Sequence, residues 1–182
     1  MVTDIVLRKG EVGIRQIELK DCTTEYVDWL NDAEVNQYLE TRWYKQDLDS
    51  IVSFVKSQRE NDHSILFAIT FGDRHIGNIK IGPYNAMHHH ADISYLIGDK
   101  SYWNKGIATT AIYLACKFGF ENWKLHRIEA GAYSAASGSW KALEKNGFKR
   151  EAVFREQVVS GGQYMDVFRY GILDREFSCN MF

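Results

Sequence analysis

The spacing of apolar residues predicts a hairpin followed by three helices in the first third of the chain. Residues 5–19 alternate imperfectly around Lys9-Gly10, which is typical of two strands joined by a tight turn. Asp21 or Thr23 can then cap a helix that carries apolar residues over 26–30. A short helix is expected around 32–39, and helical spacing predicts a longer one over 46–60.

The remaining two thirds of the chain alternate strands with helices. One hairpin is expected from the apolar runs 65–71 and 75–81, and another from 152–159 and 164–173. Between them the pattern predicts, in order, a strand over 90–97, a long helix over 106–121, a strand over 127–133 and a short helix over 139–146. This order indicates the α/β (α+β) class, with a mixed, mostly antiparallel sheet and helices on both faces.

Composition favours a single domain over residues 1–182, which is long enough to bury roughly 70% of the surface of the unfolded chain. A net charge of −2 offers no basic field for nucleic acid or an anionic membrane. The cysteines Cys22, Cys116 and Cys179 are widely spaced and are interpreted as reduced thiols. With no signal-peptide pattern and no long apolar run, a cytoplasmic protein is expected.

A candidate anion site lies where the strand that ends at Gly98 gives way to the long helix. The helix opens near Gly106 with small side chains in its first turn, so several backbone N–H groups stay uncovered. Together with the helix dipole, these groups favour a phosphate. The glycine pattern is neither that of a dinucleotide-binding fold nor that of a P-loop. On this pattern alone, an ordinary strand-to-helix connection explains the segment equally well.

Three segments carry a resemblance to a known family. Residues 102–112, YWNKGIATTAI, resemble the acyl-CoA pyrophosphate loop of the GNAT (general N-acetyltransferase) superfamily, in its ribosomal-protein-acetyltransferase-like branch. They depart from the common Y-W-G-K-G-I-A-T-E-A at Asn104 and Thr110. Residues 137–148 and 162–173 resemble the later helix and the terminal hairpin of the family. The resemblance implies a GNAT fold, with acetyl-CoA as co-substrate and no metal.

The resemblance also implies how acetyl-CoA is held. The pantetheine arm is expected to pair with main-chain groups of the strand at Leu96 and Ile97, so side-chain identity matters little there. Ala136 stands where the family often has an asparagine that holds this arm, which leaves Ser134, Ser137 or the backbone to do so. The pyrophosphate is expected over the helix start, at Lys105, Gly106, Ile107, Ala108, Thr109 and Thr110.

The GNAT reaction is attack of an amine on the thioester, which requires a proton acceptor and stabilisation of the leaving thiolate. Asp92 is the expected base, or alternatively a strand carboxylate paired with a neighbour. Ser139 matches a serine near the sulfur in some members; it is also a candidate cofactor contact, and its alternative role is a helix N-cap. Leu143 replaces the tyrosine that many members use as general acid, and Val158 replaces a carboxylate.

The resemblance also implies an acceptor site near Glu40 and Arg42, which lie among aromatic residues and could equally cover the core. His90 is a candidate lining or proton-relay residue, but neighbouring strand residues face opposite sides, so His88, His89 and His90 do not predict a metal site. A small-molecule or peptide amine of low pKa suits a site without an evident strong base. Residues 29–40 resemble members that acetylate amino sugars of surface polysaccharides, so an amino sugar is the expected acceptor. Two alternative functions remain: N-terminal acetylation of a ribosomal protein, and acyl-CoA binding by a non-catalytic module. The chain could also form a homodimer.

Overall fold

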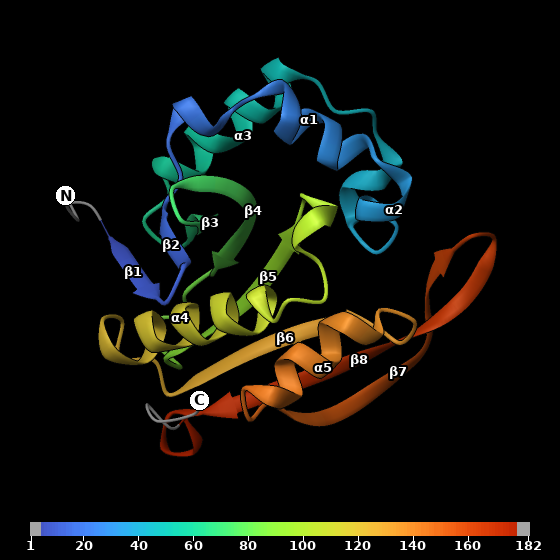
Figure 1. Ribbon diagram of the computed structural model, residues 1–182. Helices are drawn as coiled ribbons and strands as arrows, with labels where there is room; N and C mark the ends of the chain where they lie inside the picture. The colour runs from blue at the N-terminus through green and yellow to red at the C-terminus, as the bar shows by residue number, and fades with distance from the viewer. Residues whose placement is uncertain (1–4, 178–182) are drawn as a thin grey trace.

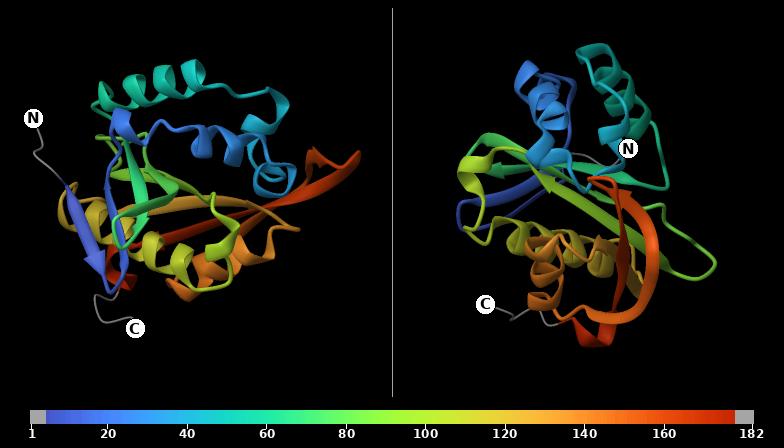
Figure 2. Two further views of the ribbon diagram at one scale, coloured as in Figure 1. Left: turned by 45° about the horizontal axis from the view of Figure 1, so that its top comes forward. Right: turned by 90° about the vertical axis from the view of Figure 1, so that its right-hand side faces the viewer.

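The computed structural model describes residues 5–177, which form one eight-stranded sheet between two helical layers (Figures 1 and 2). The strands follow the order β1-β2-β3-β4-β5-β6-β8-β7 across the sheet. They are β1 (Val6–Lys9), β2 (Val12–Gln16), β3 (Ile65–Phe71), β4 (Arg74–Ile81), β5 (His90–Ile97), β6 (Arg127–Tyr133), β7 (Lys149–Ser160) and β8 (Gln163–Leu173). The helices are α1 (Thr24–Asn31), α2 (Ala33–Asn36), α3 (Leu48–Arg59), α4 (Ile107–Glu121) and α5 (Ser137–Lys145).

The predicted α/β class is confirmed, because the sheet is mixed and helices cover both of its faces. Among the described strands, only β5 and β6 are parallel neighbours. Of the two caps considered for the first helix, Thr23 is the one used, and its side chain accepts a hydrogen bond from the Tyr26 N–H. The short helix predicted over 139–146 begins earlier, at Ser137, so that the N-cap position falls on Ala136.

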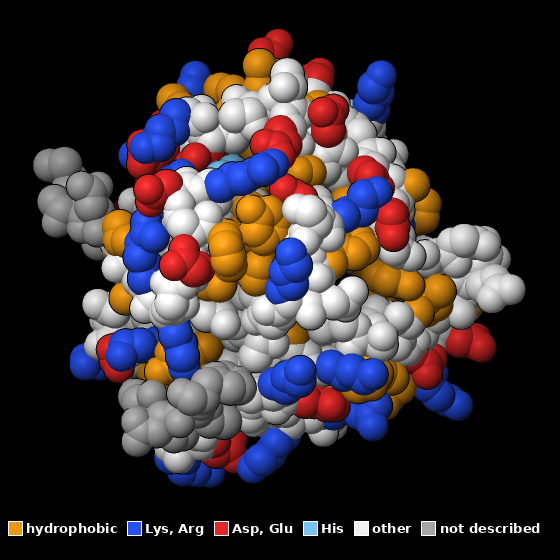
Figure 3. Space-filling view, in the orientation of Figure 1, with side chains coloured by type: hydrophobic (Ala, Val, Ile, Leu, Met, Phe, Trp, Pro, Cys, Tyr) orange, Lys and Arg blue, Asp and Glu red, His pale blue; other side chains and the backbone are white. Residues whose placement is uncertain are grey.

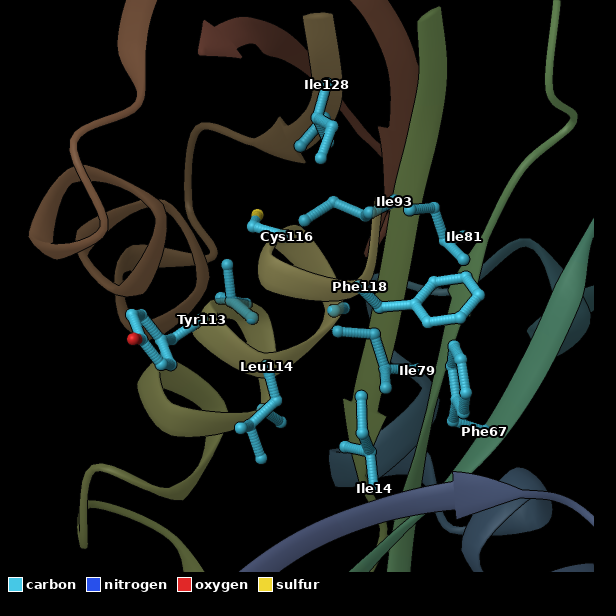
Figure 4. Packing of buried hydrophobic residues seen from close by; sticks show 14 of the residues in the cluster. Ile14, Phe67, Ile79, Ile81, Ile93, Tyr113, Leu114, Cys116, Phe118 and Ile128 are labelled. Carbon is cyan, nitrogen blue, oxygen red and sulfur yellow. The ribbon is translucent and has the colours of Figure 1, made fainter. Parts of the chain in front are cut away.

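Two apolar clusters hold the layers together. On one face of the sheet, α1 and α3 pack on alternate residues of β3 such as Leu66 and Ala68. On the other face, the intervening residues, such as Phe67, pack against α4, as Figure 4 shows for Phe67 and Phe118. The long helix is apolar around most of its circumference because it is wedged between the sheet and α5. None of the helices in residues 5–177 is long and apolar enough to cross a membrane.

The sheet opens between β5 and β6. The two strands are paired only over His90–Ile93 and Arg127–Ala130. Beyond Ile93, β5 continues to Ile97 alongside β4, while β6 continues to Tyr133 alongside β8. The strands therefore separate after their first four pairs and leave a gap whose walls are the unpaired edges of two strands. We call this the β5–β6 gap.

Candidate active site

Main-chain groups of β5 line one wall of the β5–β6 gap. The bonds from Gly82 N–H to Asp92 C=O and from Gly98 N–H to Ile76 C=O show that even-numbered residues of this strand face β4. Because main-chain groups alternate in direction along a strand, those of Tyr95 and Ile97 face the gap. The Ile97 carbonyl accepts a hydrogen bond from the indole N–H of Trp103 at 2.8 Å. An extended ligand could pair with the remaining groups.

Leu96 and Ile97, the two residues predicted to pair with the pantetheine arm, therefore point their main-chain groups in opposite directions. The main chain of Ile97 faces the gap, whereas that of Leu96 faces Asn78 of β4. The side chain of Leu96 packs on the α1–α3 cluster, on the far face of the sheet. Tyr95, for which the sequence held no signal, is the neighbour of Leu96 whose main chain faces the gap.

The start of α4 lies at the end of the gap, and its first N–H groups have no side-chain cap. Gly106 is the N-cap residue, with a left-handed φ of 74° and no side-chain cap. The first turn closes with a bond from Thr110 N–H to Gly106 C=O, so the N–H groups of Ile107, Ala108 and Thr109 precede the helical ladder. Lys105 is exposed, with its ammonium 5.4 Å from the Tyr102 ring centre. This geometry suits a pyrophosphate.

A buried asparagine fixes α5 against this helix start. The Asn146 side-chain amide donates to the carbonyls of Thr109, at 3.0 Å, and Ala142, at 2.8 Å. Asn146 is completely buried and joins the end of α5 to the first turn of α4. Sequence patterns gave no signal for this contact, because it depends on two helices meeting in space.

Ser139 lies on α5 and faces Tyr95 across the gap. The Tyr95 hydroxyl is 2.9 Å from both the Ser139 carbonyl oxygen and Ser139 Oγ. Since Ala136 occupies the N-cap position, the alternative of an N-cap role for Ser139 is wrong. Leu143 is fully buried in the core and offers no polar atom to the gap. Burial raises the pKa of Tyr95 to about 12, although the hydrogen bond with Ser139 opposes this shift.

Carboxylates gather on the opposite face of the sheet, at the point where the gap begins. Asp92 and Glu129 are register partners on β5 and β6, and the Arg169 guanidinium donates to both, at 3.0 and 3.2 Å. The Arg127 guanidinium also donates to Glu129, at 2.8 Å. Burial raises the pKa of Glu129, but the two arginines outweigh it and leave this pKa below its usual range. Asp92 thus pairs with a neighbour while its side chain remains 44% exposed.

His90 lies two residues from Asp92 on the same face, and its Nδ1 is buried without a hydrogen-bond partner. The His88 and His90 rings are stacked with their centres 6.3 Å apart. Within the part of the chain that the structure describes, no three histidine, cysteine or acidic side chains come together as metal ligands. Cys22 and Cys116 are free thiols, whereas Cys179 lies outside the described residues.

Glu40 and Arg42 lie in a short 3-10 helix, η2 (Glu40–Trp43), that contacts the end of β6. The Tyr133 hydroxyl donates to Glu40, and Arg42 donates to this hydroxyl at 3.1 Å and to the Val159 carbonyl at 2.9 Å. The hydrogen bond from Tyr133 holds the pKa of Glu40 below its usual range. These contacts tie η2 to β6 and to the β7–β8 hairpin, beside a surface cavity lined by Arg42, Trp43 and residues 159–162.

Side chains from both faces of the sheet therefore lie beside the gap. The Tyr95 side chain lies on the face covered by α4 and α5, where it meets Ser139 of α5, while Asp92, Glu129 and His90 lie on the other face together with Tyr133. Figure 3 shows hydrophobic side chains exposed in a band between the upper helices and the lower pair α4 and α5.

Comparison with known proteins decides the family. Residues 11–149 match the family model described as the acetyltransferase (GNAT) domain. The chain belongs to the GNAT acetyltransferase family. It is an acetyl-CoA-dependent N-acetyltransferase, so the resemblance seen in the sequence is confirmed and the reading as a non-catalytic module is set aside.

Two relatives and one solved structure resemble this GNAT protein over most of its length. An uncharacterized N-acetyltransferase of Bacillus subtilis is 28% identical over 91% of this chain and 95% of its own length. The spermidine N(1)-acetyltransferase of Escherichia coli is 24% identical over 91% of this chain and 88% of its own. The solved structure of RimL, a ribosomal L7/L12 α-N-protein acetyltransferase in complex with coenzyme A, superposes with a TM-score of 0.84 at 15% identity, over 93% of this chain and 98% of its own. That likeness concerns the fold.

Proposed function

We propose that this enzyme transfers the acetyl group of acetyl-CoA to a primary amine that approaches from the face carrying Asp92. The observation that carries this proposal is the β5–β6 gap, which runs from the uncovered N–H groups of α4 to the paired carboxylates at its closed end. The pyrophosphate would lie over 105–110, and the pantetheine arm would lie in the gap beside Tyr95 and Ile97. The thioester would then lie between Ser139 and Asp92.

The carboxylates favour an amine as acceptor. A cationic amine is attracted to a surface where Asp92, Glu129 and Glu40 face the approach, although Arg169 and Arg42 neutralise part of this charge. Asp92 accepts a bond from Arg169 through Oδ1 and is still 44% exposed, so it can take a proton from the amine directly or through water. We assign Asp92 the base role, with Glu40 and Arg42 shaping the acceptor wall and His90 lining it.

The class of amine is open to direct assay. The expectation of an amino sugar finds no support in the names of the relatives, which include enzymes for spermidine and for ribosomal L7/L12. A panel of spermidine, glucosamine and a short peptide with a free N-terminus separates the three classes. The same peptide with a blocked N-terminus and no lysine is the matched control.

The assay measures free CoA thiol released per amine consumed. We expect acetyl-CoA turnover with at least one member of the panel, one acetyl group transferred per thiol released, and no turnover with the blocked peptide. Thiol release that is independent of every amine would indicate hydrolysis instead of transfer, and would contradict the proposal.

A further inference from the structure

A pair of hydroxyl groups spans the β5–β6 gap where the sulfur of CoA is expected. We propose that Tyr95 is a positioning residue for the leaving group: its hydroxyl holds Ser139 so that the serine hydroxyl donates a hydrogen bond to the departing thiolate. This inference rests on the proposed function, since it concerns the leaving group of that reaction. The Ser139 hydroxyl would then be the hydrogen-bond donor at a site where the buried Leu143 side chain offers none.

The position of Tyr95 follows from strand geometry. Ile93 is the last residue of β5 paired with β6, so Tyr95 lies two residues into the gap. Side chains two apart share a face, and Ile93 is buried against α4, so the Tyr95 ring lies on the side of α4 and α5. Its main chain faces the gap. A pantetheine arm lying in the gap would pass Tyr95 before it reached Asp92.

The two hydroxyls carry two protons, and their distances allow two arrangements. Tyr95 can donate to the Ser139 carbonyl, in which case its oxygen accepts the Ser139 proton. Alternatively, Tyr95 donates to Ser139 Oγ, and the Ser139 proton is then free to point into the gap. A thiolate in the gap favours the second arrangement because it is the acceptor that the Ser139 hydroxyl would otherwise lack.

The chemical step balances without a change in either hydroxyl. The amine nitrogen forms a bond to the carbonyl carbon, the carbon–sulfur bond breaks, and its electron pair stays on sulfur. The amine gives one proton to Asp92 or to water. The thiolate accepts a hydrogen bond from Ser139 and takes a solvent proton once CoA leaves. Burial keeps Tyr95 protonated, with its pKa raised to about 12, so the phenol acts as a donor throughout.

Kinetics of Tyr95→Phe, Ser139→Ala and the double variant test this arrangement. We expect Tyr95→Phe to lower kcat by about tenfold while KM for acetyl-CoA stays within about twofold, because a single neutral hydrogen bond is lost. The double variant should be no slower than Ser139→Ala, since Tyr95 acts through Ser139. Tyr84→Phe is the matched control, because the Tyr84 hydroxyl contacts His89 at 3.3 Å, away from the gap.

A second measurement does not require the amine substrate. Ultraviolet absorbance of the thiolate gives the pKa of the thiol in enzyme-bound CoA, and we expect it to be about one unit higher in Tyr95→Phe and in Ser139→Ala than in the wild type. Identical titrations in all three proteins would overturn the inference, as would an unchanged kcat or effects that multiply in the double variant. If no amine accepts acetyl, the proposed function fails while this titration still decides the role of Tyr95.

Discussion

Replacing Gly106 by valine tests how the helix start of α4 binds acetyl-CoA. Gly106 has φ = 74°, and a Cβ atom built on it would meet no protein atom within 4 Å. The side chain would therefore project into open space at the uncovered N–H groups, where phosphate oxygens are expected. The cost to folding is the left-handed backbone, about 1–2 kcal/mol for a residue other than glycine.

Gly10 offers a matched control for this backbone cost. It turns the β1–β2 hairpin with φ = 60°, and a Cβ atom there would also meet nothing within 4 Å. Gly10→Val and Gly106→Val should therefore lower the melting temperature by similar amounts, about 2–8 °C for a chain of this size. Only Gly106→Val places a side chain at the proposed pyrophosphate site.

The difference in acetyl-CoA affinity between Gly106→Val and Gly10→Val measures the contact with the pyrophosphate. A hydrogen bond to a charged group is worth about 1.5–3 kcal/mol, so the loss of one phosphate contact should weaken acetyl-CoA binding by about ten- to a hundredfold. Isothermal titration calorimetry gives the affinities, and thermal melts of the same samples confirm folding. If folded Gly106→Val binds acetyl-CoA as tightly as Gly10→Val does, the pyrophosphate does not lie over this helix start.

Four further substitutions are informative. Asp92→Asn should lower turnover by about 10²-fold or more, whereas Glu129→Gln, which also removes a partner of Arg169, should lower turnover far less. Tyr133→Phe should raise KM for the amine severalfold and leave KM for acetyl-CoA unchanged, because it releases Glu40 and Arg42 from β6. Asp21→Asn should lower the free energy of unfolding, measured by chemical denaturation at pH 7, by about 3 kcal/mol, since it breaks the buried pair with Arg15. Burial raises the pKa of Asp21, but Arg15 and the Glu18 N–H outweigh it and lower this pKa. The difference in free energy of unfolding between the wild type and Asp21→Asn should therefore narrow as pH falls below about 4. An equal difference at pH 3 would contradict the stabilising role of the ionised Asp21 carboxylate.

The features that the sequence predicted well are those fixed by local structure. The helix that opens near Gly106 and the strand before it depend on neighbouring residues, so motif and periodicity located them together. The hairpins were equally accessible, because a turn such as Gly161-Gly162 fixes the pairing of the strands beside it. These elements were enough to indicate the family.

Contacts between distant segments could not be predicted in this way. Tyr95 and Ser139 are 44 residues apart, and Glu40 and Tyr133 are 93 apart. Each pair meets only because the sheet brings separate strands and helices together. The start of α5 was misplaced for a related reason: Ala136 provides no side-chain cap, so the helix begins without the signal that would mark its first turn.

The location of CoA in a crystal structure of the complex is the most direct test of the central claim. The β5–β6 gap predicts that the pantetheine arm lies between the two strands and pairs with main-chain groups of Tyr95 or Ile97. It also predicts that the pyrophosphate contacts the N–H groups of Ile107, Ala108 or Thr109, with the sulfur beside Ser139. CoA bound on another surface, with the gap empty, would contradict the assignment of this gap as the active site.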